Sequence, residues 1–175
     1  MPSRGIRWAA AALTVAAVAA CHAPDPNAPR RLTADVSVSG QITVANVPAL
    51  REQGFRTIVN MRPDDESPDQ AKYAQMQSAV QAAGLGYGYI PIKSGGAIPG
   101  TSVEALNTVL SRMPKPILLY SQAADSPART WALAEASRPG GLDAAAILQA
   151  VKSGGQSADD LAEQINARIA ARPKR

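Results

Sequence analysis

The sequence contains few of the side chains that enzymes use for nucleophilic or metal chemistry. It has one cysteine, Cys21, and one histidine, His22, and the two are adjacent. A single cysteine excludes an intramolecular disulfide, and two such residues are too few for a clustered zinc site. A Ser-His-Asp triad would have to recruit His22, and no GxGxxG or P-loop pattern is present. We therefore expect no metal and no cofactor.

Aromatic side chains and net charge are also scarce. Aromatic residues make up 4% of the chain and hydrophobic residues 46%, so the core must consist mainly of Ala, Val, Leu and Ile. The formal net charge is +4, and Arg4 and Arg7 lie in a segment that is predicted to be removed. This weak positive balance argues against nucleic acid as a partner. The basic end, residues 172–175, is interpreted as a solvated tail.

The first 20 residues have the pattern of an export signal. Arg4 and Arg7 precede an apolar run over residues 8–20, which is too short for a membrane-spanning helix. The run ends Val18-Ala19-Ala20-Cys21, which resembles the lipobox of bacterial lipoproteins. The resemblance implies removal of residues 1–20 and acylation of Cys21, which would anchor the chain stably in a membrane. An ordinary secretory leader is the alternative.

Residues 21–31 are predicted to form a lipid-anchored tether. Prolines are frequent in HAPDPNAPRR, residues 22–31, and favour an extended, semi-rigid spacer. By resemblance to the sorting rule of Gram-negative bacteria, His22 in place of an aspartate favours the periplasmic face of the outer membrane. The expected partners are the membrane, through acylated Cys21, and an unknown envelope protein or small anion.

Short apolar runs alternate with amphipathic segments in the rest of the chain. Strands are predicted over residues 36–39, 55–61, 85–92 and 117–120. Helices are predicted over residues 43–53, 70–83, 101–113, 126–137, 143–152 and 157–171. This alternation predicts a three-layer α/β sandwich with a mostly parallel central sheet of four or five strands.

Three of these helices carry start signals, and the last carries an apolar stripe. Thr101 with Glu104 reads as a capping box, Ser126-Pro127 as N-cap and first helical residue, and Ser157 with Asp160 as a cap. The chain divides into an α/β domain over residues 32–138 and a C-terminal helical extension over residues 139–175. In that extension, Leu161, Ile165 and Ile169 recur every four residues, which favours core packing.

The stretch Leu32–Ser137 resembles a known family. The matching pieces are residues 39–41 (SGQ), 57–63 (TIVNMRP) with Asp65 and Glu66, 90–92 (IPI), 117–120 (ILLY) and 131–133 (WAL). Their order and spacing resemble the cysteine-phosphatase-like domain of beta-lactamase hydrolase-like proteins, also labelled sulfur transferases. The resemblance implies a phosphatase-like fold.

The same resemblance implies that the catalytic loop is degenerate. In the family, the strand before the Trp-bearing helix leads into a Cys-x(5)-Arg loop, in which a thiolate attacks phosphorus and the arginine clamps its oxygens. Counted back from Trp131, the cysteine position is Ser121 and the arginine position is Ser126. Between them lie Gln122, Ala123, Ala124 and Asp125, where the family prefers a glycine at the place of Ala124. A serine hydroxyl has too high a pKa to replace a thiolate.

Other parts of the family's machinery also look absent. The loop over residues 93–99, from which such phosphatases usually take an acidic residue, has no carboxylate. Asp125 adds negative charge where a phosphate would sit, and Pro127 removes an N–H donor. Arg129 is a candidate anion contact, although a helix-surface arginine is the simpler interpretation. Arg62 and Asp65 are candidates for a cleft wall, although a charged loop is usually structural.

Three functions remain open from the sequence. We expect a cell-envelope lipoprotein whose phosphatase-like domain is a pseudoenzyme, acting as a binding or structural module. The alternative is a residual phosphoric ester hydrolase that uses the Ser121–Ser126 loop. A third hypothesis places a new active surface on the C-terminal helices.

Overall fold

A five-stranded sheet forms the centre of the structure, a computed structural model that describes residue 25 and residues 27–173. Its strand order is β1-β2-β5-β3-β4. The strands are β1 (Arg30–Arg31), β2 (Val36–Ser39), β3 (Thr57–Asn60), β4 (Gly86–Tyr89) and β5 (Ile117–Tyr120). β1 is antiparallel to β2, and the other three pairings are parallel. The predicted α/β fold with a mostly parallel sheet is confirmed.

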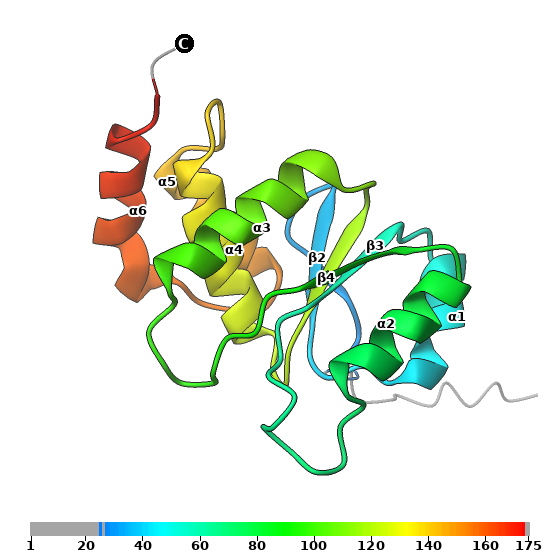
Figure 1. Ribbon diagram of the computed structural model, residues 1–175. Helices are drawn as coiled ribbons and strands as arrows, with labels where there is room; N and C mark the ends of the chain where they lie inside the picture. The colour runs from blue at the N-terminus through cyan, green and yellow to red at the C-terminus, as the bar shows by residue number, and fades with distance from the viewer. Residues whose placement is uncertain (1–24, 26, 174–175) are drawn as a thin grey trace, which may run out of the picture.

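Helices cover both faces of the sheet (Figure 1). They are α1 (Val47–Glu52), α2 (Tyr73–Ala82), α3 (Gly100–Arg112), α4 (Asp125–Ser137), α5 (Ala144–Ser153) and α6 (Ala162–Ala170), with 3-10 turns at Val44–Asn46 and Asp159–Leu161. One buried cluster joins α1 and α2 to Ile58 and Leu118. The other joins α3, α4, α5 and α6 to the opposite face, around Val59 and Leu119. The apolar strands therefore contribute side chains to two separate cores, one on each face of the sheet.

The domain begins earlier than predicted. Arg30 and Arg31, which the sequence analysis places in the tether, form β1 and pair with Val38 and Ser37 of β2. A two-residue strand of arginines carries no apolar alternation, so periodicity could not predict it. Its effect is to cover the outer edge of β2, which would otherwise be unpaired. Cys21 and the predicted signal peptide lie outside the described residues.

The three helix starts predicted from capping signals are wrong: two by one or two residues, and that of the last helix, predicted from residue 157, by five, since α6 begins at Ala162 after a 3-10 turn. α3 begins at Gly100 after Pro99, so Thr101 lies inside the helix and does not cap it. α4 begins at Asp125, and Ser126 is its second residue. The cause is local to the backbone, because the Ala124 carbonyl already accepts a hydrogen bond from the Ala128 amide at 3.1 Å. The first intrahelical bond therefore precedes the predicted cap.

The C-terminal extension is part of the core. α4 is buried on almost every side, and small residues at 128, 132, 134 and 136 let neighbouring helices approach it closely. Leu161 and Ile165 are buried in the same cluster as Trp131, and Ile169 packs against it. The predicted apolar stripe is confirmed as core packing. α5 and α6 thus form an outer layer over α4 (Figure 1).

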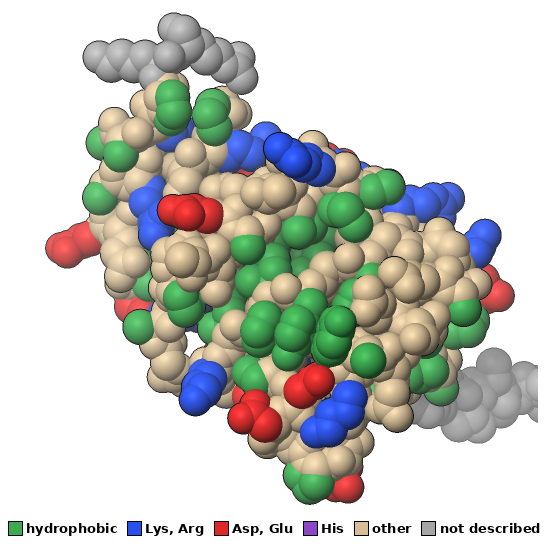
Figure 2. Space-filling view, in the orientation of Figure 1, with side chains coloured by type: hydrophobic (Ala, Val, Ile, Leu, Met, Phe, Trp, Pro, Cys, Tyr) green, Lys and Arg blue, Asp and Glu red, His purple; other side chains and the backbone are tan. Residues whose placement is uncertain are grey.

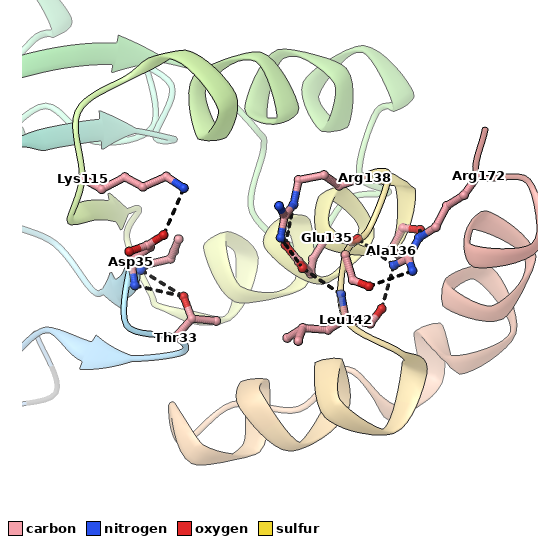
Figure 3. A network of polar contacts seen from close by, with 10 residues as sticks. Thr33, Asp35, Lys115, Glu135, Ala136, Arg138, Leu142 and Arg172 are labelled. Carbon is pink, nitrogen blue, oxygen red and sulfur yellow. Dashed lines mark hydrogen bonds and ion pairs between the residues drawn. The ribbon is translucent and has the colours of Figure 1, made fainter. Parts of the chain in front are cut away.

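Arg172 ties the end of the chain to the end of α4 (Figure 3). Its guanidinium donates to the carbonyls of Ala136 at 2.8 Å, Gly141 at 3.0 Å, Glu135 at 2.9 Å and Leu142 at 2.7 Å. The prediction of a solvated tail is therefore wrong for Arg172. The last carbonyls of a helix lack intrahelical donors, and Arg172 supplies them. Gly141 permits the tight packing, since a Cβ there would lie 2.4 Å from the Glu135 carbonyl oxygen.

Within the described residues, no helix combines the length and the apolar character needed to cross a membrane.

Candidate functional site

The parallel strands direct their carboxyl ends to one edge of the sheet. The loops after β2, β3, β4 and β5 therefore meet there, which is where ligands bind in open α/β sheets. These loops contain Gln41, Arg62, residues 93–99 and Ser121, the residues that the sequence marked as the family's site. The sheet topology brings these loops to a common edge, although not all of them line the same hollow.

Ser121 follows β5 directly and is buried. Ser121 is 1% exposed, and among the described residues its hydroxyl has no hydrogen-bond partner. Ser39, which lies opposite Tyr120 in the neighbouring strand, is equally buried and also has no partner in the described part of the chain. Gln122 and Asp125 are exposed. The hydroxyl in the nucleophile position is therefore sheltered from substrate while the loop around it faces solvent.

A hollow of about 390 Å³ lies at the N-terminus of α4. It is lined by Lys93, Gly95, Gly96, Ile98, Asp125, Ser126, Arg129 and Ser157. The loop over residues 93–99 thus faces the start of α4. The loop contributes Lys93, Gly95, Gly96 and Ile98, and Asp125 is the one carboxylate that lines the hollow among the described residues. An acid placed on α4 itself would repel a phosphate at the helix N-terminus.

Arg129 lines this hollow but is held by the C-terminal extension. Its Nη1 and Nη2 donate to Oδ1 and Oδ2 of Asp160 at 2.6 and 2.7 Å, a bidentate pair. The hydrogen bond from Arg129 lowers the pKa of the Asp160 carboxyl, and the hydrogen bond to Asp160 raises the pKa of Arg129. Asp160 therefore does not cap the last helix as predicted. Ser157 instead bonds Asp159, at 3.0 Å between Oγ and Oδ2.

Arg62 lies in a different network from the one at α4. Its Nε donates to Glu66 Oε2 at 2.7 Å, and its Nη1 donates to Gln41 Oε1 at 2.5 Å. The second oxygen of Glu66 accepts from Ser94 Oγ. These contacts tie together the loops after β2, β3 and β4. Arg62 lines a separate hollow with Gln41, whereas Asp65 is exposed and lines neither this hollow nor the one at α4.

Tyrosines fill the space beside this network. Asn60 Nδ2 donates to the Tyr87 hydroxyl at 3.2 Å, and the rings of Tyr73 and Tyr89 stack with centroids 4.9 Å apart. Burial raises the pKa of Tyr87 to about 12, and burial also raises the pKa of Tyr120. Both phenols are therefore neutral at physiological pH and cannot serve as general bases. Figure 2 shows hydrophobic side chains gathered in the middle of one face of the molecule. In Figure 1, edge strand β4 lies there between α3 and α2.

The spacing of the loop needs one correction. Four residues separate Ser121 from Ser126, so a strict Cys-x(5)-Arg count from Ser121 places the arginine at Pro127. Neither Ser126 nor Pro127 has a guanidinium, so an arginine clamp is absent under either count. Three residues that shape the site were not singled out by the sequence as partners: Gln41, Ser94 and Asp160. Their contacts join loops that are distant in the chain, so spacing gave no signal for them.

The described part of the chain offers no group of three or more His, Cys, Asp or Glu side chains that could hold a metal ion.

Comparison with known proteins places the α/β domain in a family. Residues 29–138 match the family model described as "Beta-lactamase hydrolase-like protein, phosphatase-like domain". A beta-lactamase hydrolase-like protein of Agrobacterium fabrum is 33% identical over 106 residues, which cover 61% of this chain and 24% of the relative. A protein of the same description from Xylella fastidiosa is 27% identical over 100 residues, which cover 57% and 23%. The chain thus spans about a quarter of the length of these curated relatives.

Solved phosphatase structures share the fold. A phosphatase-like protein of Neisseria meningitidis superposes with a TM-score of 0.67 at 22% identity, covering 79% of this chain and 96% of that one. A kinase-associated phosphatase whose catalytic-site cysteine is replaced by serine gives 0.64 at 13% identity, covering 86% and 100%. A cysteine-to-serine form of P. aeruginosa TpbA in complex with phosphotyrosine gives 0.55 at 16% identity, covering 86% and 88%. These similarities establish the fold alone.

Proposed function

The chain belongs to the family of beta-lactamase hydrolase-like phosphatase-like domains, and from this premise we propose that it is a pseudophosphatase. The observation that carries the proposal is the loop after β5, which has Ser121 where the family has its cysteine and no arginine at residue 126 or 127. In this proposal the fold is retained as a binding or structural module. The proposed ligand or partner is a small anion or an envelope protein.

The surroundings of the loop support the loss of catalysis. A nucleophile must reach its substrate, whereas Ser121 is 1% exposed and has no base beside it among the described residues. The bidentate pair with Asp160 occupies Arg129, which is the one arginine lining the hollow at α4 in the described part of the chain. Asp125 adds a carboxylate to the same hollow. The same facts argue against the alternative of a residual hydrolase acting through the Ser121–Ser126 loop.

An assay with p-nitrophenyl phosphate tests the proposal. We expect the full-length protein in detergent, and its Ser121→Ala and Ser121→Cys variants, to show the same hydrolysis as buffer. The cysteine variant gains a thiol but still lacks an arginine clamp and an acid, each of which contributes orders of magnitude to such a reaction. Turnover in the wild type that disappears in Ser121→Ala would overturn the proposal and establish a hydrolase. Equal turnover in all three proteins would identify a contaminating phosphatase.

We further propose that Cys21 is acylated and tethers the domain to the bacterial envelope, with the periplasmic face of the outer membrane as its location. The lipobox-like residues 18–21 support this. In a Gram-negative host fed labelled palmitate, Cys21→Ser should abolish labelling and release the protein from the membrane fraction. His22→Asp is the matched control, which should keep the label but move the protein to the inner membrane. Membrane retention of an unlabelled Cys21→Ser protein would contradict the tether.

A further inference from the structure

The two edges of the central sheet differ in how they are protected against pairing with another strand. β1 forms one edge, and it consists of Arg30 and Arg31 alone. A second copy set against β1 would bring guanidinium groups together, so charge protects this edge. β4 forms the other edge, with the sequence GYGY over residues 86–89. Each residue of β4 is half-buried and none is charged, so β4 lacks the protection that β1 has.

The backbone of β4 has hydrogen-bonding groups that the sheet does not use. The amides of Gly86 and Ile90 donate to carbonyls at the start and at the end of β3, at 2.9 Å each. Because the bonding groups of successive strand residues point in alternate directions, the N–H and C=O groups of Tyr87 and Tyr89 point away from β3. No backbone group elsewhere in the described residues bonds them. The edge therefore offers two donors and two acceptors to a further strand.

The surface around this edge is uncharged over a continuous run of the chain. Residues 73–92 contain no Asp, Glu, Lys, Arg or His, and they include all of α2 and β4. Ser78 and Gln81 of α2 are exposed, as is Tyr73, whose ring stacks on Tyr89. Hydrophobic side chains gather where β4 lies in this view (Figures 1 and 2). A two-fold axis places side chains near their own copies, so an uncharged surface avoids the repulsion of like charges there.

We propose that two copies of this chain associate through their β4 edges, antiparallel about a two-fold axis at Gly88, so that the two sheets become one continuous sheet. This register sets Tyr87 of one copy opposite Tyr89 of the other. Each such pair exchanges two hydrogen bonds, so all of the free backbone groups of both edges are satisfied. Gly88 lies opposite its own copy in a non-hydrogen-bonded pair, where strands approach most closely and the absence of a side chain helps.

The neighbouring registers leave bonds unmade. An axis at Tyr87 would require a bond from the Leu85 amide, but that amide already donates to the Val80 carbonyl at 3.0 Å. An axis at Tyr89 would require an amide hydrogen at residue 91, which is a proline. The register centred on Gly88 is therefore the one that the free groups select.

Sedimentation equilibrium of the full-length protein in density-matched detergent tests the association. We expect a monomer–dimer equilibrium with a dissociation constant on the order of 10 μM, because a short strand pair makes a small interface. Tyr89→Pro removes an outward amide and leaves the bonds from β4 to β3 in place, so it should weaken dimerisation about hundredfold. Tyr89→Thr is the matched control, which loses the ring but keeps the amide, and it should weaken dimerisation less than about tenfold. A wild-type protein that stays monomeric about a hundredfold above the expected constant, or equal weakening by the two substitutions, would overturn the proposal.

A disulfide probe tests the register. In a full-length Cys21→Ser background, Gly88→Cys is the one cysteine of the chain. Opposite residues of a non-hydrogen-bonded pair have Cα atoms about 4.5 Å apart, a separation that a disulfide can span. Oxidation with diamide should therefore give a linked dimer on non-reducing electrophoresis. A Cβ at residue 88 would lie 3.4 Å from Val59 and 3.6 Å from Val109, which are ordinary contacts.

Gly100→Cys in the same background is the matched control. Gly100 begins α3, and no atom of the described residues lies within 4 Å of a Cβ built there. It follows the carboxyl end of the sheet, and antiparallel pairing sends the two carboxyl ends in opposite directions, so its thiols should not meet. Equal linking of Gly100→Cys and Gly88→Cys would overturn the register. In cell envelopes, linking of Gly88→Cys only to a different protein would overturn self-association and assign the edge to a foreign strand, whatever the phosphatase assay shows.

Discussion

Truncation of the chain after Gly155 should unfold the α/β domain, although the removed residues lie outside the segment that matches the family. Leu161 and Ile165 are 6% and 0% exposed and pack in one cluster with Trp131. Full burial of a Leu or Ile side chain contributes about 1.5–3 kcal/mol, and the loss of Arg172 adds to this. The sum is comparable with the roughly 5–15 kcal/mol that stabilises a typical domain. Circular dichroism and urea titration of the truncated protein measure the effect.

A shorter truncation controls for the basic tail. Removal of Lys174 and Arg175 alone keeps α6 and Arg172, so it should leave the urea midpoint unchanged. A folded protein with a wild-type midpoint after truncation at Gly155 would show that α6 is dispensable. It would also restore the interpretation of residues 139–175 as a separate extension.

The burial of α6 changes how a functional surface on the C-terminal helices can be tested. Loss of partner binding on deletion of this segment would report unfolding rather than a lost contact. Exposed positions that leave the core intact, such as Glu163 on α6, are the informative ones. The apolar stripe itself is accounted for by packing, which leaves no unpartnered hydrophobic face on α6 for the third hypothesis to use.

Strands β2, β3, β4 and β5 were predictable because each carries a signal in its own residues. Short apolar runs such as ILLY at residues 117–120 are typical of strands buried on both faces. The order of the strands in the sheet, by contrast, cannot be predicted from the residues of any single segment. β1 shows the limit, since Arg30 and Arg31 form a strand only because β2 presents an unpaired edge. Helix starts were misplaced for a related reason: backbone geometry around Ala124 decided the start of α4.

The candidate site was predictable in its composition but not in its contacts. Family resemblance located Ser121 and the loop over residues 93–99, and the sheet topology brings both to one edge. The partners of Arg62 and Arg129 could not be predicted, because Gln41 lies 21 residues from Arg62 and Asp160 lies 31 from Arg129. Such pairs depend on how loops and helices meet, and neither spacing nor periodicity encodes that. The contacts of Arg172 could not be predicted for the same reason, because its partners lie about 30 or more residues earlier in the chain.

Replacement of Arg172 by methionine should lower the free energy of unfolding by about 2–3 kcal/mol. The substitution keeps an unbranched apolar stem but removes every donor from the carbonyls of Glu135, Ala136, Gly141 and Leu142. The contacts to Glu135, Ala136 and Gly141 are partly buried, so water replaces only part of the lost hydrogen bonding. Urea titration at neutral pH measures the change, and a constant slope would show that the unfolded state is unaffected.

Two further variants separate this role from a simple loss of charge. Arg172→Lys keeps the charge, but an ammonium lacks the planar fork that spans four carbonyls, so we expect it to recover less than half of the loss. Arg168→Met removes one bond, from Arg168 Nη1 to Ser137 Oγ at 3.0 Å, and should cost less than about 1 kcal/mol. Full rescue by Arg172→Lys, or an equal cost for Arg168→Met, would mean that positive charge near α4 matters rather than the geometry of the guanidinium.

The stabilisation by Arg172 should be the same at acidic pH as at neutral pH, because arginine does not titrate. The pair of Arg129 and Asp160 differs in this respect: the folded-state pKa of Asp160 is depressed, so its contribution is present above the unfolded pKa and is lost as the pH falls through the folded value.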